Sequence, residues 1–399
     1  MPVGTVERFL KKVPQYTRNM RHLRSVLQHG TPRKWSNLAL AEAERKLRRV
    51  RVKSMPYLMI IDPCNYCNLR CPLCPTGLGT LGRPQAFLSL EHFRLYFDPF
   101  APYLFEVYMH NWGESLLNRD VFRMIEHAQS RDVGTNLSSN LSATTRSDID
   151  NLLECGLEYL VVSLDGASAQ SYSKYRVRGV FENVVENMSE ILRLRKLRRR
   201  KTPVVEWQFI VMKQNEHEIP EAERMARQIG VDLLRFIPVG MPYDTPDRKA
   251  VAEEWYPVTV RGREHAPDSV EQQFGQANKP SPCFYLYRSI VINPDGGVAP
   301  CCVVYKKESD FAQLPARDLR ALWNNDHYQS GRALFSPQNA AHPVGTICDG
   351  CDIFRKYPKP APRTNIPSAA GCHPANHGGH PPSELTPPEE LVQIDGRRA

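Results

Sequence analysis

The chain has 399 residues, enough for one large domain and a small appended one. Its net charge is +9, but residues 1–54 hold 14 Lys and Arg against 3 Glu and so carry +11 by themselves. No apolar run approaches membrane-spanning length, no secretory signal is evident, and aromatic residues do not alternate with the basic ones. These features argue against an integral membrane, secreted or nucleic-acid-binding protein.

The basic segment 1–54 is predicted to be a helical extension ahead of the main fold. Trp35–Arg51 has the pattern of a helix, with apolar Leu38 and Leu47 and a basic face. Such a helix can pack, solvated, on the outside of the domain. The alternative is peripheral contact with an anionic membrane or a phosphorylated ligand.

A cysteine loop follows the first predicted strand, Tyr57–Asp62. Cys67, Cys71 and Cys74 have C-x3-C-x2-C spacing. Thiolates are the usual ligands of iron–sulfur clusters, and three of them leave one iron of a [4Fe–4S] cluster open to a bound molecule. A zinc knuckle is the alternative, although zinc sites usually pair two C-x2-C units. Cys64 fits no cluster spacing.

This loop, placed after a first strand, resembles the signature of the radical S-adenosylmethionine (radical SAM) superfamily. The resemblance implies an α/β fold, a partial (β/α)6 barrel similar to an incomplete TIM barrel, over residues 55–238. It also implies that the open iron binds SAM. A reductant such as flavodoxin or ferredoxin then drives SAM cleavage to a 5′-deoxyadenosyl radical, which abstracts a hydrogen atom from the substrate.

Strands and amphipathic segments alternate downstream, which predicts parallel βαβ units. The strands are expected at Phe105–His110, Val133–Asn136, Tyr159–Leu164, Val205–Met212 and Leu233–Pro238. The helices are expected at Ser89–Phe97, Asn118–Ser130, Arg146–Cys155, Val180–Arg199 and Glu218–Ile229.

Polar residues at the carboxyl ends of these strands are candidates for SAM binding, because such barrels carry their chemistry there. The resemblance assigns this role to Trp112, Gly113, Glu114, Ser139, Ser163, Asp165, Arg176 and Arg178. It implies that Ser163 bonds the SAM ribose and that Arg176 or Arg178 holds the SAM carboxylate in a bidentate contact. For Ser139, ordinary turn chemistry is an equal alternative.

A second group of cysteines lies in the last third of the chain. Cys283 is followed by Gly296 after twelve residues and by Cys301 after four more, and Cys348 and Cys351 form a C-x2-C pair. The segment 290–298 is predicted to be a hairpin that brings Cys283 and Cys301 together.

This pattern resembles the SPASM and twitch domains that follow radical SAM barrels, here over residues 283–357. It implies that Cys283, Cys301, Cys348 and Cys351 hold a second, auxiliary [4Fe–4S] cluster. The twitch form, with one such cluster, is favoured because Cys372 alone follows the pair. A four-thiolate zinc site is the alternative, and Cys302 stays open as an alternate ligand.

Two segments lack regular patterns. Residues 239–282 are expected to be a linker or substrate loop between the barrel and the auxiliary domain. Residues 358–399 contain nine Pro and four Gly, a composition that predicts a disordered tail.

The sequence therefore predicts a radical SAM enzyme of the oxidoreductase type that oxidises or epimerises a carbohydrate (a glycan) or another small molecule. Reduced cysteines and oxygen-sensitive clusters suit the cytoplasm. The alternatives are a ribosomal-peptide maturase and a non-catalytic binding protein stabilised by zinc or a cluster. No catalytic acid or base can be assigned from the sequence.

Overall fold

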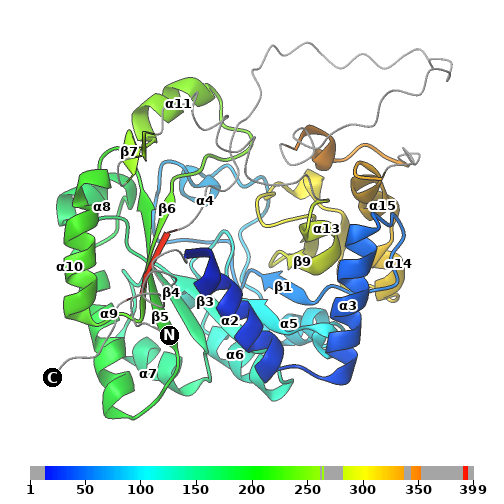
Figure 1. Cartoon of the computed structure of the whole chain (residues 1–399), viewed down its shortest axis with the longest axis horizontal. Coiled ribbons are helices and arrows are strands. Elements are labelled where there is room, and N and C mark those ends of the chain that lie inside the picture. Colours follow the sequence, from blue (N-terminus) through cyan, green and yellow to red (C-terminus); the bar gives the residue numbers. More distant parts are fainter. Residues whose placement is uncertain (1–13, 261–262, 265–281, 337–342, 352–389, 394–399) are drawn as a thin grey trace, which may run out of the picture.

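A ten-stranded sheet forms the centre of the protein, as seen in a computed structural model that describes residues 14–260, 263–264, 282–336, 343–351 and 390–393 (Figure 1). The strand order is β11-β10-β9-β1-β2-β3-β4-β5-β6-β12. Six of these strands are Leu58–Ile61 (β1), Glu106–Tyr108 (β2), Gly134–Ser139 (β3), Tyr159–Ser163 (β4), Val204–Val211 (β5) and Leu233–Pro238 (β6). The others are Ser289–Ile292 (β9), Gly297–Ala299 (β10), Ala312–Gln313 (β11) and Glu390–Gln393 (β12).

Strands β1 to β6 are parallel and follow one another in chain order, with helices between them. The expected α/β fold with a partial (β/α)6 barrel is therefore confirmed. The connecting helices are Pro75–Leu78 (α4), Leu90–Phe97 (α5), Val121–Ser130 (α6), Arg146–Glu154 (α7), Ala169–Tyr175 (α8), Phe181–Leu197 (α9) and Ile219–Ile229 (α10).

The side chains of the barrel strands alternate between an apolar and a polar face. On β5, Val205, Trp207 and Phe209 are fully buried in the main hydrophobic core, whereas the intervening Glu206 is buried on the other face.

Capping residues in the sequence determine where the helices begin. For example, α7 begins with a capping box between Thr145 and its Asp148.

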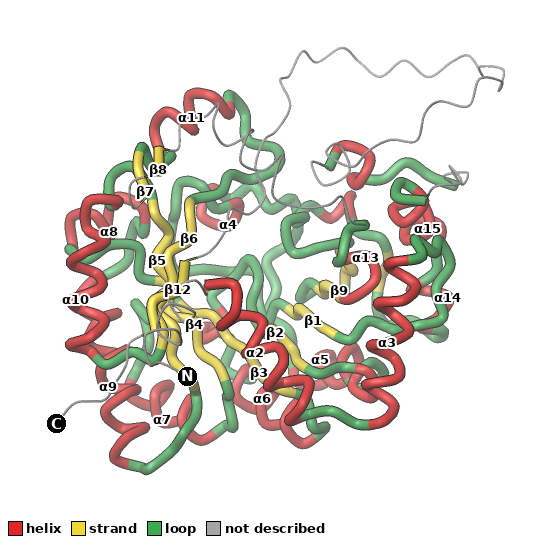
Figure 2. Tube along the Cα trace, viewed as in Figure 1, coloured by secondary structure: helices red, strands yellow, loops and turns green. Residues whose placement is uncertain are grey.

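Two helices, Pro14–Gln28 (α2) and Pro32–Lys46 (α3), make up the N-terminal extension. Helix α3 starts earlier than the predicted 35–51 helix because Thr31 caps it and Pro32 occupies its first turn. It ends at Lys46, since Arg48 takes a left-handed φ of 57°. Helix α2 lies across the sheet on the side away from α7, α9 and α10 (Figures 1 and 2).

Helix α2 inserts charged side chains onto the polar face of the barrel sheet. Arg21 donates a hydrogen bond to the Tyr108 hydroxyl at 3.1 Å and lies 4.4 Å over the ring of Tyr159. His22 Nδ1 is 2.7 Å from the Glu106 carboxylate. The extension is thus part of the fold, and not merely a helix on its outside. The contact with an anionic membrane stays a prediction.

The auxiliary region continues the barrel sheet. It holds the β9–β10 hairpin, as predicted, and the helices Tyr285–Arg288 (α13), Leu319–Trp323 (α14) and Asp326–Ala333 (α15). Strand β9 pairs in parallel with β1, so that Ile290 stands beside Met59. This pairing makes the two regions share one sheet and one hydrophobic core.

Residues 239–282 contain more order than expected of a linker. They include the helix Arg248–Trp255 (α11) and a small sheet of Thr259–Val260 (β7) and Arg263–Glu264 (β8). Trp255 is buried and meets the ring of Tyr175 edge-on at 5.7 Å, which anchors this segment to the barrel. Residues 265–281 lie outside the described residues.

The expectation of a disordered tail is wrong at one place. Glu390–Gln393 form β12, which pairs antiparallel with β6. The Glu-Leu-Val-Gln sequence contains β-favouring residues, and pairing satisfies the otherwise open edge of β6. The rest of the tail, including Cys372, lies outside the described residues. In the ranges that the structure describes, no helix is long and apolar enough to cross a membrane.

Candidate cofactor site

The three cysteines of the first loop lie between β1 and α4, at the carboxyl end of β1. Burial, the Glu114 carboxylate and the thiols of Cys71 and Cys74 raise the pKa of Cys67 to about 12. The thiols therefore lie within electrostatic reach of one another. The backbone N–H of Leu69 points to Cys67 Sγ at 3.4 Å. Such N–H···S contacts stabilise a thiolate ligand of an iron–sulfur cluster.

The segment after β2 is held tightly against this loop. The backbone N–H of Trp112 donates to the buried Asp62 carboxylate at 2.8 Å. A Cβ on Gly113 would lie 1.8 Å from the carbonyl oxygen of Cys64, so the close approach requires glycine. Cys64 Sγ lies 3.1 Å from the Glu114 carbonyl oxygen. Cys64 therefore joins the two segments, although its spacing fits no cluster.

The end of the third strand contributes both the predicted Ser139, whose side chain hydrogen-bonds the Glu114 carboxylate, and Asn140. The Asn140 backbone N–H donates to Glu114 at 2.8 Å, and its side chain donates to Asn68 in the cysteine loop at 3.0 Å. Ser139 Oγ accepts a hydrogen bond from the Leu141 backbone at 3.0 Å, which is the turn chemistry weighed above. The Ser-Ser-Asn turn was the available signal for Asn140.

The two candidate arginines, Arg176 and Arg178, lie in different surroundings. Arg176 is 14% exposed, its Nη1 is 4.0 Å from Cys71 Sγ, and its Nε donates to the fully buried Asp165. Arg178 is exposed and takes a left-handed φ of 72°. Arg176 therefore contacts the cysteine loop, whereas the Arg178 side chain is exposed. Ser163 stands at the carboxyl end of β4, with its Oγ 3.5 Å from that of Ser138.

His110, two residues after β2, is a candidate residue that the sequence analysis missed. Its ring meets Tyr108 edge-on at 5.8 Å. Burial, together with Arg21 and Arg235, lowers the pKa of His110 to about 4, so the imidazole is neutral at pH 7. Its Nδ1 has no hydrogen-bond partner among the described residues. Its position just before the Asn111–Glu114 segment was the available signal, whereas nothing in the sequence placed Arg21 there.

The structure also brings the four downstream cysteines together. Cys283 precedes α13, Cys301 follows β10, and Cys348 and Cys351 lie at the short 3-10 turn Ile347–Gly350. Burial and then Cys351 and Cys302 raise the pKa of Cys283 to about 12. Burial and the neighbouring thiols hold the pKa values of Cys301 and Cys348 well above the usual value.

Cys302 stays open as an alternate ligand, because its Sγ lies 3.1 Å from the Tyr285 hydroxyl beside the same group. Within the described ranges, no three His, Cys, Asp or Glu side chains surround the position of a single metal ion. The donor set of each loop consists of thiols that are half-buried or buried, and such a set fits an iron–sulfur cluster.

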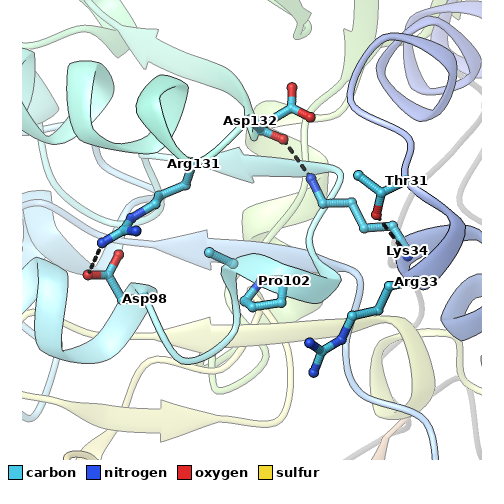
Figure 3. Close-up of a pocket in the computed structure, with 8 residues that line it drawn as sticks. Thr31, Arg33, Lys34, Asp98, Pro102, Arg131 and Asp132 are labelled. Atoms are coloured by element: carbon cyan, nitrogen blue, oxygen red, sulfur yellow. Dashed lines mark hydrogen bonds and ion pairs between the residues drawn. The ribbon is translucent and has the colours of Figure 1, made fainter.

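A cavity of about 330 Å³ lies at the amino-terminal ends of β2 and β3, whereas the first cysteine loop follows the carboxyl end of β1 (Figure 3). Its charged groups are already paired. Lys34 Nζ donates to the Asp132 carbonyl oxygen at 2.6 Å, and Arg131 binds Asp98 at 3.1 Å. We therefore do not place the functional site there.

The fold and the two cysteine groups are those of an iron–sulfur protein built on a partial barrel. Residues 61–226 match the model of the radical SAM superfamily, and residues 283–352 match the SPASM iron–sulfur cluster-binding domain. The chain belongs to the radical SAM superfamily and carries a SPASM domain. It accordingly binds a [4Fe–4S] cluster and SAM, with auxiliary iron–sulfur binding in the SPASM domain.

Curated relatives share low identity with this chain. A stretch of 182 residues is 25% identical to the AdoMet-dependent heme synthase of Methanosarcina barkeri, over 45% of this chain and 50% of that protein. The chain thus spans about half the length of this relative. The PqqA peptide cyclase of Xanthomonas campestris is 22% identical over 74% of this chain and 79% of its own length. A tungsten-containing aldehyde ferredoxin oxidoreductase cofactor-modifying protein of Pyrococcus furiosus is 22% identical over 80% and 94%.

The fold is similar to that of solved structures. SuiB of Streptococcus suis bound to its precursor peptide SuiA has a TM-score of 0.55 at 13% identity, over 80% of this chain and 74% of that chain. Its complex with S-adenosylmethionine has a TM-score of 0.53 at 14% identity, with the same coverage. At these identities the likeness shows the fold alone.

Proposed function

We propose that this radical SAM enzyme modifies a peptide. One observation carries the proposal: PqqA peptide cyclases recur among the relatives, and the match with that of Xanthomonas campestris extends over 74% of this chain and 79% of the cyclase. The match with the heme synthase covers 45% of the chain, and the match with the cofactor-modifying protein of Pyrococcus furiosus covers 80%, so the recurrence of peptide cyclases, and not match length, favours a peptide. The peptide-binding SuiB has the same fold. A peptide therefore replaces the carbohydrate or other small molecule expected from the sequence as the favoured substrate.

The proposed roles of the residues follow from their positions. Cys67, Cys71 and Cys74 hold the SAM-binding cluster, which supplies radical chemistry when bound. The Trp112–Glu114 segment and Arg176 bind and orient SAM beside it. Asp165 orients Arg176 through their buried ion pair. An electron donor of the flavodoxin or ferredoxin type supplies the reducing electron.

The polar face of the barrel suits a substrate that is itself rich in hydrogen-bonding groups, as a peptide backbone is. This face carries Glu106, Asn136 and Glu206, all buried, together with the neutral His110. Asn136 Oδ1 and His110 Nδ1 are without hydrogen-bond partners among the described residues. Free acceptors and donors in a buried position favour a ligand that satisfies them.

The proposal can be tested by co-expression with the short peptides encoded beside the gene, followed by mass spectrometry of each peptide. We expect one peptide to change mass, for example by the loss of two hydrogen atoms on cross-linking. The triple variant Cys67→Ala, Cys71→Ala, Cys74→Ala is the control and should leave that peptide unmodified. Unmodified peptides throughout, together with consumption of a small molecule by the wild-type enzyme, would contradict the proposal.

A further inference from the structure

A buried group of hydrogen-bond donors lies in the auxiliary region without an acceptor. Trp323, Tyr328 and Arg332, from α14 and α15, are fully buried. Trp323 Nε1, the Tyr328 hydroxyl and Arg332 Nη2 have no hydrogen-bond partner in the described part of the chain. A buried donor left without an acceptor loses its hydration without compensation and is therefore costly. Three such donors side by side indicate that something else accepts from them.

Arg332 also lacks a neutralising carboxylate. Its Nε donates to the Leu286 carbonyl oxygen at 2.9 Å, and its Nη1 lies 3.3 Å from Asn324 Oδ1. None of the ion pairs between described residues includes Arg332. Glu44 acts on it electrostatically, but the Glu44 oxygens accept from Ser54 and from the backbone N–H of Lys53. A buried charge without an anion is expensive.

Aromatic rings offset only part of this cost. The guanidinium carbon lies 4.8 Å from the ring centre of Trp323, 5.3 Å from that of Tyr328 and 5.6 Å from that of Tyr287. Burial lowers the pKa of Arg332 to about 10, so the side chain stays a cation at neutral pH. The packing therefore encloses a positive charge that needs a negative partner.

Two hydrogen bonds of α15 place the donor group beside the segments that carry the auxiliary cysteines. Arg332 bonds the Leu286 carbonyl oxygen, three residues after Cys283, and the Ser330 hydroxyl accepts from the Val344 backbone at 3.1 Å, four residues before Cys348. Burial raises the pKa of Tyr328, Arg332 opposes this rise, and Cys348 and Cys301 add to it. Leu286 lies in α13, which begins two residues after Cys283. The donor group thus packs between the helices that carry and support the auxiliary cysteines.

We propose that Arg332 and Tyr328 stabilise the negative charge of the auxiliary cluster and so raise its reduction potential. A [4Fe–4S] cluster with four thiolates is anionic, and reduction adds a further negative charge. A nearby cation and hydrogen-bond donors therefore favour the reduced form. This inference rests on the proposed ligands Cys283, Cys301, Cys348 and Cys351. In it, Arg332 acts on the cluster through its charge and Tyr328 through its hydroxyl, and neither residue is a ligand.

The test is an EPR-monitored redox titration of the full-length, anaerobically reconstituted enzyme. The auxiliary signal is the one that addition of SAM leaves unchanged. We expect Arg332→Met to shift its midpoint to a more negative potential and Tyr328→Phe to shift it by a smaller amount in the same direction. Arg332→Lys, which keeps the charge, should stay closer to the wild type.

Tyr287→Phe is the matched control. The Tyr287 ring also faces Arg332, but its hydroxyl donates to the Arg49 carbonyl oxygen at 3.0 Å, so its loss should leave the potential unchanged. If Arg332→Met fails to fold, the midpoint potential of the nearly isosteric Tyr328→Phe variant tests the inference. An auxiliary midpoint that does not move, or becomes more positive, overturns the inference alone. Absence of any SAM-insensitive signal from the wild type overturns the proposed auxiliary ligands as well.

Discussion

At the scale of single residues, the cofactor site depends on contacts between segments far apart in the chain. Asp165 is fully buried, and it accepts hydrogen bonds from the Ile210 backbone at 2.7 Å and from Arg176. That ion pair sets the orientation of Arg176 toward Cys71. Arg178, two residues later, points to solvent. Variants of the two arginines can therefore be compared: one arginine is held by a buried carboxylate, and the other is exposed.

We expect Arg176→Met to abolish most 5′-deoxyadenosine formation from SAM in the reduced enzyme. The variant loses the cation beside Cys71 and leaves the buried Asp165 without its cation, a change that costs about 3–5 kcal/mol. Arg178→Met should retain the wild-type rate. The amount of 5′-deoxyadenosine that each variant forms is measured by chromatography. An equal loss of 5′-deoxyadenosine formation in both variants would show that Arg176 has no special role.

At the scale of elements, Glu42 in α3 binds residues at the amino-terminal end of β1 and in α13. This carboxylate accepts hydrogen bonds from the Tyr57 hydroxyl at 2.6 Å and from Arg288 at 2.7 Å. Arg45, one turn further along α3, binds it at 3.0 Å. Burial opposes the charge, but Arg288, Tyr57 and Arg45 together lower the pKa of Glu42 to about 2. One side chain thus connects the N-terminal extension, β1 and α13.

Glu42→Gln should lower the free energy of unfolding by about 2 kcal/mol at pH 7. Because the pKa of Glu42 is lowered on folding, its stabilisation is complete above the unfolded pKa near 4.5 and is lost as the pH falls toward about 2. Urea unfolding followed by circular dichroism measures the effect. The exposed Glu186 in α9 provides the control, and Glu186→Gln should change stability by less than about 0.5 kcal/mol.

At the scale of the whole molecule, Arg83 joins the barrel to the auxiliary region. Its side chain is 1% exposed and binds Asp295 at 2.9 Å and Asp310 at 2.8 Å. Its Nε also donates to the Tyr305 carbonyl oxygen at 2.7 Å. The loop that follows the first cysteine group is therefore fixed to the hairpin that precedes Cys301. The two cluster sites belong to one packed unit.

Arg83→Met should destabilise the protein by about 3–5 kcal/mol, because it leaves two largely buried carboxylates without their cation. We expect faster proteolysis and a lower urea midpoint for this variant. Arg123→Met removes an exposed ion pair with Asp120 and should cost at most about 1 kcal/mol. Indistinguishable midpoints for the two variants would show that Arg83 does not hold the regions together.

Much of the fold was predictable from the sequence. The strands β1 to β6 and most connecting helices lie within a few residues of their expected positions, because strongly apolar runs alternating with amphipathic segments have few other ways to bury their surface. The hairpin of β9 and β10 followed in the same way from its turn residues. The spacing of Cys67, Cys71 and Cys74, and their place after β1, carried the resemblance to the radical SAM superfamily, because ligand type and spacing are local properties.

Only the tertiary structure decided the contacts between distant segments. Nothing local indicated that β9 would pair with β1, that Glu390–Gln393 would cover the edge of β6, or that Arg21 would lie among the polar side chains of the barrel. The choice of Arg176 over Arg178 likewise depends on Asp165. Contacts between distant segments depend on which buried charges and open strand edges remain without a partner after the whole chain has packed. A local sequence pattern does not show which charges and edges these will be.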